Sequence, residues 1–256
     1  MNSTAPPVIF SPKRREAAQQ RMLRLQKTGN PANFLSADVA QDILERLAFF
    51  RFIPAKALLM GDLSGILTAG LSDLGAIVTA VDPFEFNLEA PWPLSGFDFI
   101  ACLFTLDTVN DLPGVLIHQR HALSEGGLAI NTLAGAGSLP ILRDVMLAAD
   151  GPRPAPRLHP QIDVRAGGQL LQRAGYASPV VDTCSFHVRY GKLETLIHDV
   201  RAQGLSNVLA DPGPPLSVSS LEIARSAFAE RADSQGRVTE TFEILTLSGW
   251  QGAAHS

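Results

Sequence analysis

Hydrophobic and polar positions along the chain form two repeating patterns. Short apolar runs stand at 57–60, 77–81, 97–103 and 128–132, and each is bounded by glycine, proline or aspartate. Such runs predict buried parallel strands. Apolar residues at helical spacing predict helices over 64–74, 111–123, 139–149, 163–174, 193–203 and 221–231. Two further strands are predicted at 180–190 and 238–247. Strand and helix therefore alternate, which is typical of a doubly wound α/β sheet.

Two helices are predicted before the first strand. Ser11 and Pro12 supply an N-cap and a first-turn proline for a helix to about Lys27, and Ser36 is expected to cap a second helix. We expect a disordered tail over 1–10, N-terminal helices over 11–54, a single α/β domain over 55–250 and a short tail over 251–256.

Composition narrows the class of protein. At 256 residues, with 46% hydrophobic and 18% charged residues, the chain is long enough to bury a core without a disulfide or a metal. Its two cysteines, Cys102 and Cys184, are both expected to be buried and inert, which fits a reducing cytoplasm. The net charge of −4 argues against nucleic-acid binding. The histidines lack metal-ligand spacing, so no metal site is predicted.

Positive charge is concentrated near the N-terminus. The predicted first helix carries six cations opposed by Glu16 alone: Lys13, Arg14, Arg15, Arg21, Arg24 and Lys27. Such a helix could contact an acidic partner or, peripherally, an anionic membrane, and the alternative is a solvated face. No window of about 18 apolar residues predicts a membrane span.

A strand, glycine turn, helix and second strand ending in an acid form a nucleotide-binding pattern. Gly61 and Gly65 follow the first predicted strand, and Asp82 ends the second. Leu59 and Leu63 stand where an acid and a middle glycine are usual in motif I of the class I methyltransferases, which this segment resembles. A leucine at 63 places a side chain where bare backbone normally meets the ligand.

The interval after Asp82 is short. Asp98, in the next strand, follows by only 16 positions. A helix of about 11 residues and a strand of about 5, with loops, would need well over 20. The prolines at 83, 91 and 93 also disfavour a helix here. We expect one helix–strand unit, the one that covers the adenine ring in class I methyltransferases, to be missing.

More motifs point to a particular subfamily. They are Phe34-Leu35, Val109 to Gly114, Leu123 to Gly127, Asp163, Arg165, Leu170 to Tyr176, Val181-Asp182, Tyr190, Asp199 to Arg201, Gly204, Ser206-Asn207, Thr241 to Ile244 and Trp250. Over about residues 10–250 the chain resembles the methyltransferase-like complex I assembly factors, known as arginine hydroxylases of a complex I subunit and related to the malonyl-carrier-protein methyltransferase of biotin synthesis. It departs from them at the cofactor loop, in the missing segment, and at Asp107-Thr108, where an aromatic pair is usual.

The resemblance implies a class I methyltransferase fold, mostly parallel with an antiparallel C-terminal strand, and S-adenosylmethionine as cofactor. The implied cofactor residues, vestigial or weakly binding here, are Gly61, Asp62, Ser64, Gly65, Asp82, Pro83, Leu103 and Phe104. Asp82 binds ribose or only closes a strand-end turn. Phe84, Phe86 and Trp92 either stack on an adenine or a partner, or pack under a loop.

Arg201 and Asn207 either bind a peptide partner or form a structural turn.

The sequence supports two hypotheses about function. One is an assembly-factor-type protein with a degenerate cofactor pocket that acts on or holds a protein client. The other is a working S-adenosylmethionine-dependent methyltransferase with an altered cofactor loop. A dinucleotide-binding oxidoreductase is disfavoured, because no G-x-G-x-x-G follows the first strand. No catalytic residue is assigned.

Overall fold

A central mixed sheet organises the molecule. The computed structural model describes residues 7–29 and 31–252, and within them the sheet has six strands in the order β2-β1-β3-β4-β6-β5. The strands are β1 (Lys56–Met60), β2 (Ile77–Ala80), β3 (Phe97–Leu103), β4 (Leu123–Ala134), β5 (Ala177–Tyr190) and β6 (Val238–Trp250). The first four pair in parallel, while β6 pairs antiparallel with both β4 and β5. The predicted fold class is thereby confirmed.

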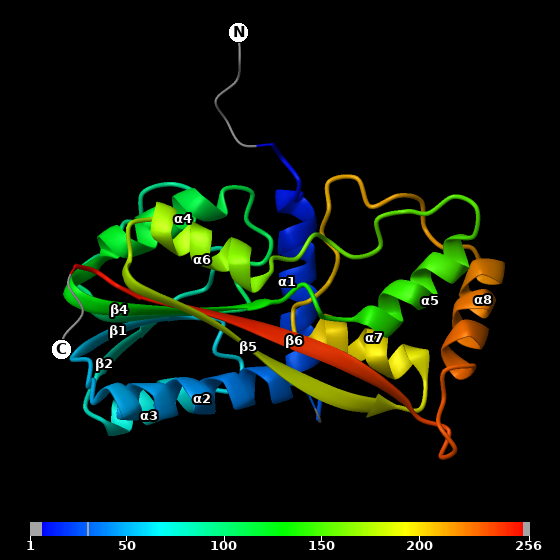
Figure 1. The fold of residues 1–256 in the computed structure, drawn as a ribbon, viewed down its shortest axis with the longest axis horizontal. Helices are drawn as coiled ribbons and strands as arrows, with labels where there is room; N and C mark the ends of the chain where they lie inside the picture. The colour runs from blue at the N-terminus through cyan, green and yellow to red at the C-terminus, as the bar shows by residue number, and fades with distance from the viewer. Residues whose placement is uncertain (1–6, 30, 253–256) are drawn as a thin grey trace, which may run out of the picture.

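Helices cover both faces of this sheet. They are α1 (Pro12–Gln26), α2 (Phe34–Phe50), α3 (Ile66–Asp73), α4 (Leu112–Ala122), α5 (Pro140–Asp150), α6 (Val164–Arg173), α7 (Leu193–Ala202) and α8 (Val218–Ala229). Figure 1 shows α4 and α6 on one face, α2 and α3 on the other, and α1 crossing near the middle. Side chains alternate along β1, so Ala57 and Leu59 join the core under α2 while Leu58 and Met60 join the core under α4.

The missing helix–strand unit is confirmed. Residues 81–96, all of them described, contain neither a helix nor a strand and lead directly from β2 to β3. This segment closes on itself by packing Phe86 against Trp92, whose ring centroids are 5.6 Å apart, above the buried Leu88. As a result β2 is an edge strand of four residues, and Ile77 remains 67% exposed.

Of the two helix caps predicted from the sequence, at Ser11 and Ser36, one is confirmed. Ser11 accepts a hydrogen bond from the Arg14 amide, and Asp111 and Asp163 cap α4 and α6 in the same way. The prediction for Ser36 is wrong, because α2 begins earlier, at Phe34. The buried Ser36 hydroxyl instead accepts a hydrogen bond from the Ser64 amide at 3.3 Å.

Some boundaries also differ. The sequence predicts that Gly126 and Gly127 precede the fourth strand, but both lie inside β4, where Gly126 has φ +72° and the register with β3 shifts. The irregularity accommodates the extra residues and lets β4 begin at Leu123. Cys184 is exposed, contrary to expectation, because it lies on β5, the other edge strand of the sheet, whereas Cys102 is buried.

A short N-terminal strap, residues 9–11, holds α1 in place. Phe10 is buried and pairs with Leu209, and the Ser11 amide donates to the Val208 carbonyl at 2.9 Å. The expected tail over 1–10 is therefore wrong at Phe10, while residues 1–6 lie outside the described residues. The Asn110 side chain clamps the strap by accepting from the amides of Ile9 and Phe10 at 2.7 and 2.8 Å.

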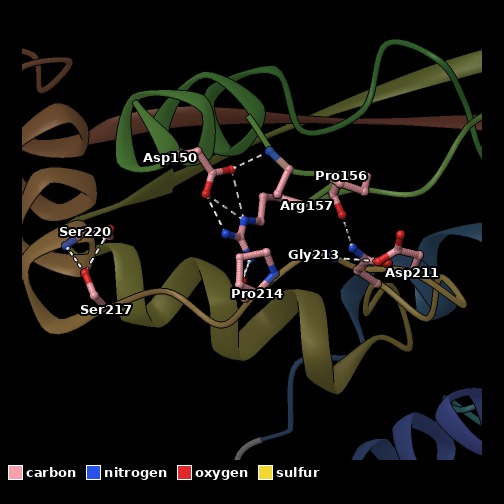
Figure 2. A network of polar contacts seen from close by, with 10 residues as sticks. Asp150, Pro156, Arg157, Asp211, Gly213, Pro214, Ser217 and Ser220 are labelled. Carbon is pink, nitrogen blue, oxygen red and sulfur yellow. Dashed lines mark hydrogen bonds and ion pairs between the residues drawn. The ribbon is translucent and has the colours of Figure 1, made fainter. Parts of the chain in front are cut away.

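A second clamp ties the proline-rich segment 151–160 to the rest of the molecule. The Arg157 guanidinium donates to both oxygens of Asp150 and to the Pro214 carbonyl, as Figure 2 shows. The Arg157 side chain thus links the end of α5 to the loop before α8.

Candidate functional site

A cavity of about 320 Å³ lies where β1, β2 and β3 end. This volume is in the lower part of the range of small-molecule sites. The cavity is lined from three sides by residues after β1, after β2 and after β3, and α1 and the residues following α7 close it. Of the cofactor residues implied by the resemblance, the lining includes Gly61, Asp62, Asp82, Pro83, Leu103 and Phe104, whereas Ser64 and Gly65 are not part of it.

Gly61 fixes the floor of the cavity. Its φ is +81°, and a Cβ at this position would stand 2.1 Å from the Leu103 carbonyl oxygen. Only glycine therefore allows the loop after β1 to press against the end of β3. Gly65 also has a positive φ, of +71°, but a Cβ there would meet no other atom within 4 Å, so Gly65 serves the turn before α3 rather than a close approach.

Asp62 is committed to the start of α3. Its Oδ1 accepts from the Gly65 amide and the Ser64 hydroxyl, both at 3.0 Å. Its Oδ2 accepts from the amide and hydroxyl of Thr68, at 2.8 and 2.7 Å. Four donors thus use this carboxylate, which satisfies the amide of the N-cap Gly65 and the Thr68 amide in the first turn of the helix. Asp62 therefore acts as a helix cap beside the cavity.

Leu63 and the post-β2 residues shape the cavity further. Leu63 is partly exposed and lines the cavity. Asp82 is exposed, and its Oδ1 accepts from the Phe84 amide at 2.9 Å, which closes a tight turn. The turn role of Asp82 is thus present, and a ribose contact remains compatible with its position in the lining.

Two lining residues were missed by the sequence analysis as site residues. Arg15, on α1, has only 13% of its side chain exposed, and its guanidinium lies 5.5 Å from the centroid of the Phe84 ring. Gln203, just after α7, is 3% exposed, and its Oε1 accepts from the Leu35 amide at 3.0 Å. Arg15 is one of several arginines on its helix and Gln203 belongs to no motif, so only the packing of α1 distinguishes them.

The loop after β3 carries a perturbed acid. The Asp107 Oδ1 accepts from the Ala134 amide at 2.6 Å, while its buried Oδ2 has no hydrogen-bond partner among the described residues. Burial raises the pKa of Asp107 to about 7, and the hydrogen bond from Ala134 opposes this shift. Asp107 is not in the cavity lining.

The predicted partner residues lie apart from the cavity. Asn207 donates to the Pro156 carbonyl at 2.7 Å and accepts from the Leu209 amide at 2.9 Å, so its side chain supports a structural turn. Arg201 is exposed on α7, where its pKa is lowered by burial of part of the side chain and by the nearby charge of Arg21. Arg201 thus extends the positive surface of α1 instead of meeting Asn207 in one site.

A second cavity, of about 760 Å³, is lined in part by the strap. It is lined by Ile9, Met146 and Leu158 among others, and by His159, which is 6% exposed. Burial lowers the pKa of His159 to about 4, so this ring is neutral at physiological pH.

Within 7–29 and 31–252 no group of three or more His, Cys, Asp or Glu side chains is placed to hold a metal ion. No helix in the same ranges is long and apolar enough to cross a membrane.

Known proteins resemble the chain in sequence. It is 28% identical over 165 residues to the mitochondrial arginine-hydroxylase NDUFAF5 of Rattus norvegicus, a match covering 63% of this chain and 48% of the relative. It is 29% identical over 243 residues to the malonyl-acyl-carrier-protein O-methyltransferase of Halorhodospira halophila, covering 84% and 81% of the two chains. The chain thus spans about half the length of the arginine-hydroxylase relatives. No protein-family model matches.

The fold also has a solved counterpart. A Bacillus halodurans protein assigned as a methyltransferase superposes with a TM-score of 0.51 at 14% identity, covering 82% of this chain and 98% of its own. At this identity the superposition establishes the fold alone. Sequence and structure therefore agree on the class I S-adenosylmethionine methyltransferase fold.

Proposed function

We propose that this chain, with its class I methyltransferase fold, is a protein of the complex I assembly-factor type that acts on or holds a protein client. In this proposal its cofactor pocket is degenerate and does not fit S-adenosylmethionine in the usual way. The observation that carries the proposal is the state of Asp62: all four of its hydrogen bonds come from the turn before α3 and from Thr68. This carboxylate has no remaining role toward a ligand.

Three further features oppose the usual cofactor. Leu63 places a branched side chain in the cavity, and the absent unit after β2 removes the wall expected beside the adenine. The Arg15 guanidinium lies over the Phe84 ring and so occupies one face on which an adenine would stack. It also adds positive charge to a cavity that would receive a sulfonium cation, which is unfavourable by Coulomb's law.

The basic face of α1 suggests the kind of client. Its exposed cations are Lys13, Arg14, Arg21, Arg24 and Lys27, and Arg201 on α7 lies beside them. The chain as a whole has a net charge of −4, so this positive surface stands out from the remainder. A protein segment rich in aspartate and glutamate is the partner that such a surface favours. The free thiols of Cys102 and Cys184 are consistent with a reducing compartment such as the cytoplasm.

Calorimetric titration with S-adenosylmethionine and S-adenosylhomocysteine tests the pocket. We expect no binding heat from protein that is shown by circular dichroism to be folded. Micromolar binding that disappears in Asp82→Ala would contradict the degenerate pocket, because Asp82 is the one family-matched acid still exposed at the cavity.

Fluorescence anisotropy with a labelled glutamate-rich peptide tests the surface. Binding should weaken strongly with added salt and with the double change Arg21→Gln and Arg24→Gln, because exposed charges are screened. The matched control is Arg165→Gln with Arg173→Gln on α6, which removes the same charge elsewhere. Equal loss of binding in both double variants would reject the basic face of α1 as the docking surface.

The alternative is an active S-adenosylmethionine-dependent methyltransferase with an altered cofactor loop. The tight approach of Gly61 to Leu103 and the cavity of about 320 Å³ favour it, as does the similarity to a malonyl-acyl-carrier-protein methyltransferase. The calorimetric titration separates the two functions, since only the alternative requires cofactor binding.

A further inference from the structure

The cavity beneath α1 holds hydrogen-bond donors that nothing in the described protein uses. The Arg15 Nε is buried and has no hydrogen-bond partner among the described residues. The Gln203 Nε2 is in the same condition, and both residues line the cavity. Buried polar groups are nearly always paired, so each unpaired donor calls for an explanation such as a ligand.

The charge of Arg15 is only weakly compensated. Its nearest carboxylate is Glu89, whose Oε1 lies 3.9 Å from the Arg15 Nη1, beyond hydrogen-bond distance. The same Oε1 already accepts from the Asn110 amide at 2.8 Å. Burial lowers the pKa of Arg15 and the Glu89 charge raises it, and an arginine remains protonated at neutral pH. Arg15 is therefore a buried cation with donors to spare.

Gln203 is held in a fixed orientation by the protein. Its Oε1 accepts from the Leu35 amide near the start of α2, which leaves the Nε2 as the donor that faces no acceptor among the described residues. Because its residue is 3% exposed, the unpaired Nε2 is not hydrated from bulk solvent. The unpaired Nε2 of Gln203 is therefore an observation independent of the positive charge on α1.

The acids of the cavity leave room for an anion. Asp62 is saturated by its four donors, so it presents no open acceptor and little need of a cation. Asp82 is exposed, which allows water to screen its charge.

Arg15 and Met22 both line the cavity, and their separation corresponds to about 10 Å along α1. The cavity thus offers a cation near Phe84 and an amide donor on Gln203. The residue after Gln203, Gly204, lies close to the Met22 sulfur.

We propose that this cavity binds a small organic anion, whose carboxylate or phosphate is held by Arg15 while a second acceptor group of the ligand meets the Nε2 of Gln203. Such a ligand satisfies both unpaired donors and compensates the buried guanidinium. The assignment differs from the family cofactor in charge, since it favours an anion over a cation. It stands whether or not the protein also holds a client.

Isothermal calorimetry and thermal unfolding with three probes test this site: inorganic phosphate, citrate and adenosine 5′-monophosphate. At least one probe should bind and raise Tm, and the comparison among them distinguishes a phosphate from a carboxylate ligand. Arg15→Gln should weaken the binding by about tenfold or more, as expected for loss of a charge-assisted hydrogen bond. The matched control is Arg165→Gln, an exposed charge on α6 that belongs neither to the cavity lining nor to the basic face of α1, and it should change affinity little.

A second variant keeps the test decisive if Arg15→Gln unfolds. Gln203→Glu retains an oxygen for the Leu35 amide but replaces the unpaired donor with an acceptor, so anion binding should also fall by about tenfold. Binding should persist in moderate salt, since buried pairs are screened less than exposed ones. Absence of binding by all three probes, or equal weakening by Arg15→Gln and Arg165→Gln, would overturn the proposal. S-adenosylmethionine binding would instead refute the degenerate pocket and is measured separately.

Discussion

Individual side chains decide which groups the cavity presents to a ligand. Asp62 lies directly after Gly61, at the point where a ligand-facing acid would be useful, yet its carboxylate turns toward the start of α3. The Thr68 hydroxyl reinforces this choice by donating to Oδ2 at 2.7 Å. A single carboxylate cannot both saturate four donors of a helix start and face a ligand. The Asp62 carboxylate therefore stabilises the start of α3, although it lies next to the cavity.

Asp107 should make stability depend on pH. Its pKa is about 7 in the folded protein against an ordinary value of 3.8, because burial disfavours the charged form. Between these values the folded protein binds more protons at this site than the unfolded chain does. The free energy of unfolding contributed by Asp107 therefore falls as pH rises from about 4 to about 7, and is constant above that window.

Urea unfolding of wild type and Asp107→Asn across the same window checks this expectation. The asparagine keeps an acceptor for the Ala134 amide and cannot ionise, so the variant should gain stability relative to wild type as pH rises. His159 has the opposite dependence, since its lowered pKa removes stability as pH falls from 6.5 toward about 4, but it is present in both proteins. A difference between the two proteins that does not change with pH would contradict the buried, protonated acid.

The residues of the cavity were only partly predictable from sequence. Gly61 and Asp82 follow strands, and their pattern placed them at one edge of the sheet, where both line the cavity. Arg15 and Gln203 come from segments about 190 positions apart in the chain and meet only because α1 packs beside α7. No local periodicity contains that information. Asn207 was ambiguous for the reverse reason, since turn formation and ligand binding use the same side-chain groups.

At the scale of elements, short-range chemistry predicted most helices correctly. Ser11 accepts the amide hydrogen bond expected of a cap. Asp111 and Asp163, where helices were predicted to start, also accept a hydrogen bond from an amide of the first turn. Ser36 failed because Phe34 and Leu35 already belong to α2, and the buried serine hydroxyl is used by the tertiary contact with Ser64. A cap is thus predictable where no distant group competes for the same oxygen.

The strap and α1 form an element whose position depends on Asn110. Asn110 accepts from the Ile9 and Phe10 amides and donates to the Phe10 carbonyl, at 2.7, 2.8 and 3.2 Å. Asn110→Ala should reduce the free energy of unfolding by about 1–3 kcal/mol, because two strap amides lose their acceptor. It should also speed hydrogen exchange of the strap and of the Ala210 amide, which donates to the Ile9 carbonyl.

Denaturant unfolding combined with hydrogen exchange measures both effects. Asn33→Ala is the matched control, since Asn33 precedes α2 and makes no side-chain cap hydrogen bond. If Asn110→Ala leaves exchange at residues 9–11 unchanged, the strap is held by Phe10 packing and its bridge to Leu209 instead.

For the whole molecule, the absence of one helix–strand unit could be derived from the sequence because it depends on a count of residues. The interval between Asp82 and Asp98 is too short for a helix and a strand, and the structure indeed passes from β2 to β3 through an irregular segment. At the other edge of the sheet β6 lies between β4 and β5, and no local sequence pattern predicts this position. It followed only from the family resemblance, which supplied the antiparallel strand.

The deletion should leave a gradient of local stability across the sheet. β2 has four residues and pairs only with β1, and Ile77 is 67% exposed where another strand and helix would have covered it. Strand β3, in contrast, pairs on both sides and is almost entirely buried. Few buried contacts and one-sided pairing lower the free energy needed for local opening. We therefore expect residues 77–81 to exchange amide hydrogen much faster than 97–103, as measured by mass spectrometry under native conditions.

β5 is the internal comparison, because it is also an edge strand but forms a long ladder with β6. Protection of 77–81 equal to that of 97–103 would contradict the prediction and mean that another surface covers β2. Slow exchange in β5 together with fast exchange in β2 would show that the low local stability lies at the edge where the helix–strand unit is missing.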